Sequence, residues 1–156
     1  MTGKHHFSES VLIKAPARSV YEVIADYQKG HVDILPKPPF VSLVVEQGGV
    51  GSGTIIQVTM KVLGRKQSFR SVISEPEPGR KLVETNDTGY VTTFVVEPRN
   101  EGSSAYVTIS TEAKDKKGIV AAIERWMVRR LMQPVFAKEL VLLEEVATSW
   151  ELNGEV

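Results

Sequence analysis

Histidine is the side chain best suited to acid/base chemistry near neutral pH, and one of the three histidines lies among other polar groups. His31 is within a few residues of Asp26, Tyr27 and Asp33. Because His31 and Asp33 are two positions apart, they would point in different directions on a helix and would make a poor catalytic pair. His31 is therefore a candidate acid/base or ligand-binding residue, with a surface or helix-capping role as the alternative.

Other polar side chains lie on segments with the composition of β-strands. Arg70 could hold the polar head of a ligand, and Tyr90 and Tyr106 each offer a hydroxyl group that could orient one. An exposed position on a strand is the alternative for each of them. These residues suit ligand binding better than any specific catalytic mechanism.

Several kinds of site are excluded by the sequence. The chain has no cysteine, which rules out disulfides, cysteine nucleophiles and thiolate metal sites. It also has no GxSxG, HExxH or Walker motif. The segment 48–53, GGVGSG, lacks the Lys-Ser/Thr pair and the helix of a phosphate-binding loop, so we expect a flexible hairpin or lid. No cofactor or metal is expected.

The composition is that of an ordinary globular domain. The 156 residues are 42% apolar and 24% charged, and nineteen acidic residues balance nineteen basic ones. This balance argues against a nucleic-acid-binding surface. The sequence has no signal-peptide pattern and no run of about 18 apolar residues. We expect a single domain over 1–156 in the cytoplasm, and the sequence leaves its oligomeric state open.

The elements that position these residues are a long C-terminal helix and a set of strands. Segment 117–150 is the only one with sustained helical periodicity, and Pro134 within it should kink the helix. A row at intervals of four is interrupted at Glu139 and then resumes. The apolar members of this row are Ile119, Ile123, Met127, Leu131, Val135, Leu142, Val146 and Trp150.

The rest of the chain is mostly β-rich. A first strand at 7–14 is followed by a helix at 17–27, opened by Pro16, and by a helical turn at 31–35. Short turn segments separate the later strands, which favours antiparallel pairing. Alternation places Ile56, Val58 and Met60 on one dry face, and Phe94 on the dry face of a later strand. The six later β segments are 41–47, 54–63, 66–74, 80–85, 90–98 and 104–113.

The long helix is apolar on more than one side, since Met132 and Phe136 lie off the main row. A helix with a single contact needs only one apolar stripe, so this pattern predicts either a pocket between helix and sheet or a partner surface. Met60 and Met127 suit a wall that accepts varied apolar shapes. The alternative is that these side chains simply fill a core.

The order of elements resembles the START-like (SRPBCC) superfamily, the helix-grip fold, in its bacterial polyketide cyclase/dehydrase and lipid-transport branch. The resemblance is carried by SESVLIKAPARSVYEVIADYQK, SVISEPEPGRKLVET, TTFVVEPRNEGSSAYVTIST and the closing helix. It implies an α+β fold in which a seven-stranded curved antiparallel sheet wraps a long C-terminal helix, with two short helices after the first strand. It also implies a cavity for a hydrophobic small molecule or lipid between sheet and helix. These motifs specify a fold better than a substrate.

We therefore expect binding or transport of a hydrophobic small molecule or lipid. A polyketide cyclase/dehydratase-like enzyme using a cavity acid/base residue, and an interaction module with a vestigial pocket, remain as alternatives. Two interpretations remain for the cluster of Arg125, Trp126, Arg129 and Arg130. It could make transient contact with a membrane, or it could be an ordinary solvated surface. The expected ligand-binding residues are Tyr27, His31, Ile56, Val58, Met60, Phe69, Arg70, Tyr90, Phe94, Ile123, Met127 and Leu131.

Overall fold

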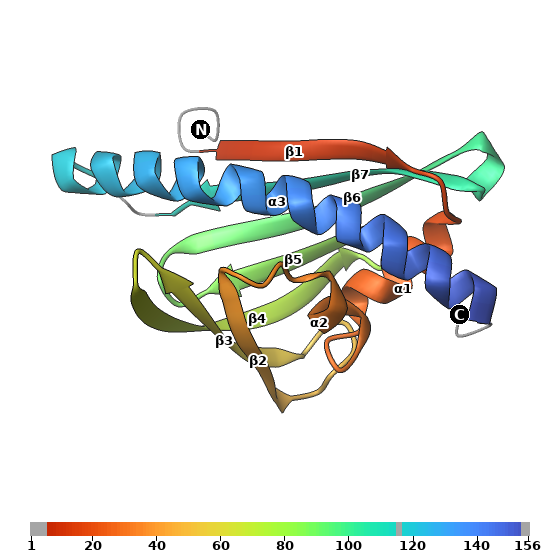
Figure 1. Cartoon of the computed structure of the whole chain (residues 1–156), viewed down its shortest axis with the longest axis horizontal. Helices are drawn as coiled ribbons and strands as arrows, with labels where there is room; N and C mark the ends of the chain where they lie inside the picture. Colours follow the sequence, from red (N-terminus) through yellow and green to blue (C-terminus); the bar gives the residue numbers. More distant parts are fainter. Residues whose placement is uncertain (1–5, 115–116, 154–156) are drawn as a thin grey trace.

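The computed structural model describes residues 6–114 and 117–153. Seven strands form one sheet, and a 35-residue helix lies across it (Figure 1). The expected α+β architecture is thereby confirmed. The elements in chain order are β1 (His6–Ile13), α1 (Ala17–Ala25), α2 (Gly30–Ile34), β2 (Phe40–Gln47), β3 (Ile55–Val62), β4 (Arg65–Glu77), β5 (Lys81–Asn86), β6 (Tyr90–Arg99), a 3₁₀ turn (Asn100–Gly102), β7 (Ser104–Ala113) and α3 (Ile119–Asn153).

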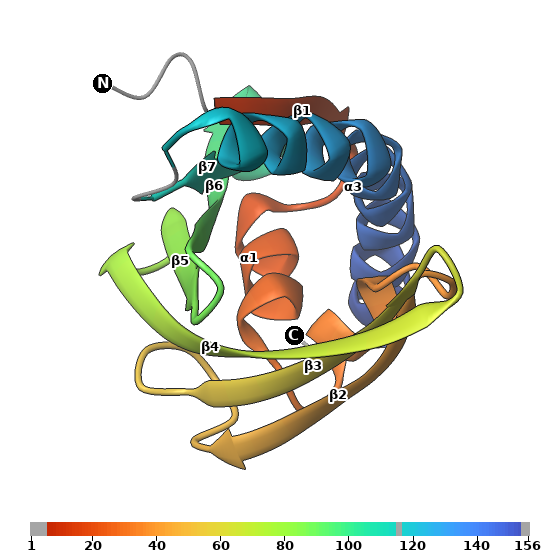
Figure 2. The ribbon, with the colours of Figure 1, turned by 90° about the vertical axis from the view of Figure 1, so that its left-hand side faces the viewer.

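The sheet is antiparallel throughout, in the order β1-β7-β6-β5-β4-β3-β2. Strands β2 to β7 follow one another as a meander because short turns connect them. The first strand pairs with the last, so β1 and β2 form the two edges and the helices between them lie inside the curve. Figure 2 shows the sheet bending around α1, with α3 closing the ring.

Helix α3 continues through Pro134 without interruption. Its buried residues all belong to the C-terminal half, from Phe136 to Trp150, which packs on α1 and α2. Phe136 also stacks on Phe7 of β1, with ring centroids 5.6 Å apart. Buried side chains therefore hold the C-terminal half of the helix and not its N-terminal half.

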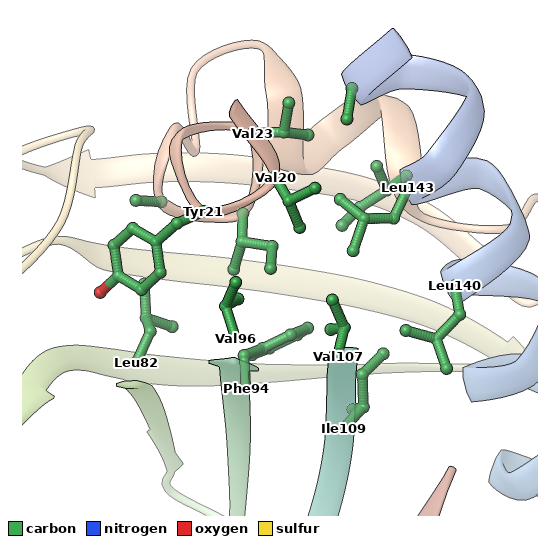
Figure 3. Close-up of a cluster of buried hydrophobic side chains, with 14 of the residues drawn as sticks. Val20, Tyr21, Val23, Leu82, Phe94, Val96, Val107, Ile109, Leu140 and Leu143 are labelled. Atoms are coloured by element: carbon green, nitrogen blue, oxygen red, sulfur yellow. The ribbon is translucent and has the colours of Figure 1, made fainter. Parts of the chain in front are cut away.

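The hydrophobic core lies at the same end of the molecule. Figure 3 shows it between α1, the strands β5 to β7 and the C-terminal half of α3. Helix α1 contributes a fully buried face because its apolar residues recur at helical spacing. The core residues labelled there are Val20, Tyr21, Val23, Leu82, Phe94, Val96, Val107, Ile109, Leu140 and Leu143.

The glycine-rich segment 48–53 joins the antiparallel strands β2 and β3, as expected for a hairpin, but hydrogen bonds tie it to its surroundings, unlike a free lid. The amide of Tyr27 donates to the carbonyl of Gly49 at 2.8 Å. The amide of Gly51 donates to the carbonyl of Ala25 at 3.0 Å. On the other side, the Ser52 amide donates to Glu75 Oε1 at 2.8 Å. The segment thus fastens the end of α1 to the sheet. Sequence reading could not find these long-range partners.

Candidate functional site

Burial of the inward-facing residues of β3 and β6 increases in one direction. On β6, Tyr90 and Thr92 are half-buried, whereas Phe94 is fully buried. On β3, Val62 is half-buried and Ile56 is fully buried. Figure 2 looks along the molecule from the end at which α3 begins, and α1 lies at the far end. The concave face is therefore more open at the start of α3 and closed at α1.

Helix α3 shows the same gradient along its inward row. Leu131 is 38% exposed, Val135 is half-buried, and Glu139 is 3% exposed. The contact between Tyr90 Oη and Glu124 Oε2, at 2.7 Å, places the first turns of the helix beside the start of β6. Large apolar side chains near the beginning of a helix are thus left accessible where the sheet is also open. Such accessible apolar surface marks binding sites more often than chance.

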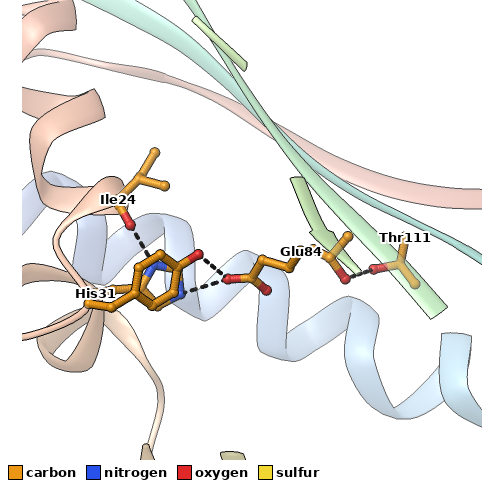
Figure 4. A network of polar contacts seen from close by, with 6 residues as sticks. Ile24, His31, Glu84 and Thr111 are labelled. Carbon is orange, nitrogen blue, oxygen red and sulfur yellow. Dashed lines mark hydrogen bonds and ion pairs between the residues drawn. The ribbon is translucent and has the colours of Figure 1, made fainter. Parts of the chain in front are cut away.

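A buried polar network lies toward the closed end (Figure 4). Tyr27 Oη donates to Glu84 Oε2 at 2.5 Å, and His31 Nε2 lies 3.3 Å from the same oxygen. The His31 ring stacks on Tyr27 with centroids 4.2 Å apart and meets the edge-on ring of Phe94 at 5.5 Å. Burial raises the pKa of Tyr27 well above its usual value and Glu84 raises it further, so the phenol keeps its proton and donates.

The hydrogen bonds define where protons sit on His31. Its Nδ1 is 2.7 Å from the carbonyl oxygen of Ile24, which can only accept, so Nδ1 carries a hydrogen. In a neutral ring, Nε2 would then present a lone pair to Glu84 Oε2. Nε2 lies 3.3 Å from Glu84 Oε2, and a proton on either atom would make this contact a hydrogen bond. An imidazole and a carboxyl in contact are side chains of the kinds that serve in general acid/base catalysis.

Glu139 of α3 is the second buried carboxyl of this region. Burial raises its pKa well above the usual value, and the nearby charge of Glu84 raises it further. Among the residues that the structure describes, no group hydrogen-bonds to its side chain. A buried polar group without a partner costs stability, so natural proteins tend to keep one where it has a function.

The structure brings three of the expected ligand-binding residues into direct contact and turns five more toward the inside of the sheet. Tyr27 and His31 meet in the network, and Phe94 contacts His31. Half-buried Phe69 and Tyr90 lie toward the open end. The remaining sheet residues that face inward are the buried Ile56, Val58 and Met60.

Arg70 does not join them. Its guanidinium lies on the outer face of the sheet and pairs with Glu46, at 2.5 Å from Nε to Oε1. On α3, Met127 is 37% exposed and Ile123 is 55% exposed. Leu131 and Met127 are near the opening, whereas Ile123 is turned further toward solvent because residues four apart drift around a helix.

Glu84 and Glu139 are the residues that sequence reasoning missed, although each left a signal. Glu84 is two positions from the buried Leu82 and so shares its face of β5. Glu139 occupies the place in the four-residue row where the apolar sequence is interrupted. A charged residue in an otherwise apolar periodic row is therefore a better guide to this site than the histidine alone.

Two surface hollows, of about 570 and 160 Å³, lie along the seam between α3 and the edge strand β1. The larger is lined by Trp126, Arg129, Arg130 and Gln133 together with Glu9 of β1. Neither hollow is lined by the residues of the buried network. In the described part of the chain, no helix is long and apolar enough to cross a membrane.

The fold and this interior define a protein of the helix-grip class, and comparison with known families agrees. The model of the family described as polyketide cyclase / dehydrase and lipid transport matches residues 4–148. The chain therefore belongs to this family, within the START/SRPBCC superfamily. A search of curated protein sequences found no match.

Solved structures share the fold at low sequence identity. The KanY protein is 21% identical, with a TM-score of 0.74, and the match covers 92% of this chain and 97% of that one. The Zhui aromatase/cyclase from Streptomyces sp. R1128 is 17% identical, with a TM-score of 0.73 over 93% and 94% of the two chains. A START superfamily protein from Mycobacterium smegmatis is 15% identical, with a TM-score of 0.67 over 92% and 97%. At these identities the likeness shows the fold and does not carry over any residue's role.

Proposed function

We propose that the protein binds a hydrophobic small molecule or lipid between the open end of the concave sheet and the N-terminal half of α3. The observation that carries the proposal is the shared burial gradient, in which Leu131 and Phe69 remain accessible while Glu139 and Phe94 are buried. Covering a large apolar side chain contributes roughly 1.5–3 kcal/mol, which favours a ligand that fills this end.

The loose attachment of α3 supports access to the interior. In the described helix, none of residues 119–135 is buried, and burial begins at Phe136. A segment with few buried contacts opens at low cost in free energy. The first turns of α3 can therefore shift to admit a molecule while the C-terminal half stays packed on α1 and α2.

Binding of a neutral apolar probe tests the proposal. The fluorescence of N-phenyl-1-naphthylamine, which rises in apolar surroundings, should increase saturably with protein concentration. Native mass spectrometry of the purified protein would also detect a co-purified ligand. The proposal is overturned if the folded protein shows no saturable probe binding.

A second candidate function is acid/base catalysis on the bound molecule, in the manner of a cyclase or dehydratase. It is favoured by the contact between His31 Nε2 and Glu84 Oε2, which are 3.3 Å apart. A ketone probe such as 2-acetylnaphthalene, incubated in D₂O, would then exchange its methyl hydrogens faster with protein than without it. His31→Ala should abolish the acceleration while probe affinity is retained. Exchange that His31→Ala leaves unchanged would remove His31 from any such mechanism.

A further inference from the structure

Some polar atoms of the buried network have no hydrogen-bond partner among the described residues. Glu84 Oε2 receives both Tyr27 and His31, and the hydroxyls of Thr92 and Thr111 bond to each other at 2.8 Å. Within the described residues, no hydrogen bond reaches Glu84 Oε1 or the carboxyl of Glu139. Two carboxyl groups from different elements, β5 and α3, thus retain free hydrogen-bonding atoms in one region.

Glu139 also lies at the buried end of a run of apolar side chains on α3. One turn toward the opening is Val135, and beyond it are Met132 and Val128, all three partly buried against the core. The inward row is therefore apolar from the opening down to a single carboxyl. A molecule lying along this row would place its apolar body against these side chains and its inner end beside Glu139.

We propose that Glu139 and Glu84 form a hydrogen-bonding site for the oxygen of an uncharged carbonyl- or hydroxyl-bearing hydrophobic ligand. This inference rests on the proposed function and specifies its ligand class. The uncharged acid donates through its hydroxyl and accepts through its carbonyl oxygen, which matches both a ketone and an alcohol. A ligand carboxylate or phosphate would bring a further negative charge beside Glu84 in a poorly solvated region, where like charges repel strongly.

The groups that interact with Glu139 agree with this ligand class. Glu84 of β5 and Tyr27, in the segment joining α1 and α2, both interact electrostatically with Glu139. Neither carries a positive charge. The cationic form of His31 would lie against Glu84 and be compensated there. Among the described residues, neither of the two groups that interact electrostatically with Glu139 would attract an anionic ligand.

Three matched naphthalenes test the proposal by calorimetric titration near pH 7: 2-acetylnaphthalene, 2-ethylnaphthalene and 2-naphthoate. We expect the ketone to bind about fivefold more tightly than the hydrocarbon, the gain of one hydrogen bond, and the carboxylate to bind most weakly. Glu139→Leu should remove the preference for the ketone, whereas Glu139→Gln, which keeps a donor, should retain it. Circular dichroism would verify that both variants are folded.

The outcomes separate this inference from the proposed function. Equal affinity of the wild-type protein for ketone and hydrocarbon would overturn the polar site while leaving apolar binding intact. A ketone preference that persists in Glu139→Leu would also overturn it. Tightest binding of 2-naphthoate would contradict the ligand class. If no naphthalene binds, both the inference and the proposed function fail.

Discussion

His31 Nε2 and Glu84 Oε2 lie 3.3 Å apart and connect α2 to the middle of the sheet. The pair is almost enclosed, since the side chain of His31 is 3% exposed and that of Glu84 17%. Its electrostatic coupling is therefore much less screened by water than that of a surface ion pair. The interaction is strong enough to be measured.

A double-mutant cycle should detect this coupling. His31→Phe and Glu84→Gln should each lower the free energy of unfolding by about 1–3 kcal/mol, because each leaves a buried partner unsatisfied. The double variant should lose less than the sum, with a coupling of about 0.5–3 kcal/mol. Urea denaturation measures all four proteins.

The exposed pair Arg18–Glu22 on α1, 3.0 Å apart, is the matched control. Its cycle, made with Arg18→Ala and Glu22→Gln, should give a coupling of about 0.5 kcal/mol or less. Additive effects at His31 and Glu84 would show that the two side chains do not interact measurably.

Glu139 should make stability depend on pH. Its pKa in the folded protein is raised from the ordinary value of 4.5, so the folded state binds more protons than the unfolded state above that pH. The free energy of unfolding of the wild type, relative to Glu139→Gln, should therefore fall as pH rises from 4.5 toward the folded pKa. The limiting slope is about 1.4 kcal/mol per pH unit. Denaturation series across this range measure the difference.

Glu145→Gln serves as the control on the same helix, because Glu145 is exposed. Its difference from the wild type should show no comparable slope. If the free energy of unfolding of Glu139→Gln also changes with pH as that of the wild type does, the Glu139 carboxyl ionises normally and is not kept uncharged by the fold.

Gly30 allows α2 to approach α1 closely. A Cβ atom added there would lie 2.6 Å from the carbonyl oxygen of Val23 and 3.0 Å from the ring of Trp150. Because the first contact is with backbone, Gly30→Ala should cost about 2–3 kcal/mol in the free energy of unfolding. It should also disturb His31, the next residue.

Gly79→Ala is the matched control. Gly79 has a positive φ of 87° but open space around it, so alanine should cost only about 1–2 kcal/mol of backbone strain. The two variants are compared by thermal and urea denaturation. Equal losses would mean that close packing of α1 and α2 is not what requires glycine at position 30.

Much of the fold could be predicted from the sequence because two periodicities of apolar residues define its elements, one of two residues in strands and one of 3.6 residues in helices. The two-residue alternation in β3 sets which side of the sheet is buried, and the resulting assignment of Ile56, Val58 and Met60 to the inner face is confirmed. The same rule shows why the expected ligand-binding set could not be right in full. Phe69 and Arg70 are consecutive on one strand, so only one of them can face inward.

The candidate site was less predictable because it depends on how elements pack. His31 was recognised by its chemistry, but its partner Glu84 lies on a distant strand and Glu139 on the last helix. Periodicity places Glu139 on the apolar row of α3, yet only the packed structure shows which turns of that row are covered. The anchoring of segment 48–53 depends on long-range backbone hydrogen bonds in the same way.

The central claim is that the open end of the concave face, beside the first half of α3, takes up an apolar molecule. A charge introduced there should block it, since burying an unpaired carboxylate under a ligand is costly. Leu131→Glu tests this position, and Leu152→Glu is the control, because Leu152 is 82% exposed near the other end of the helix.

The most direct measurement is a fluorescence titration of the three proteins with N-phenyl-1-naphthylamine. We predict saturable binding at one site in the wild type and in Leu152→Glu, and at least tenfold weaker binding in Leu131→Glu. Equal binding by all three proteins would place the probe elsewhere on the surface and contradict the account.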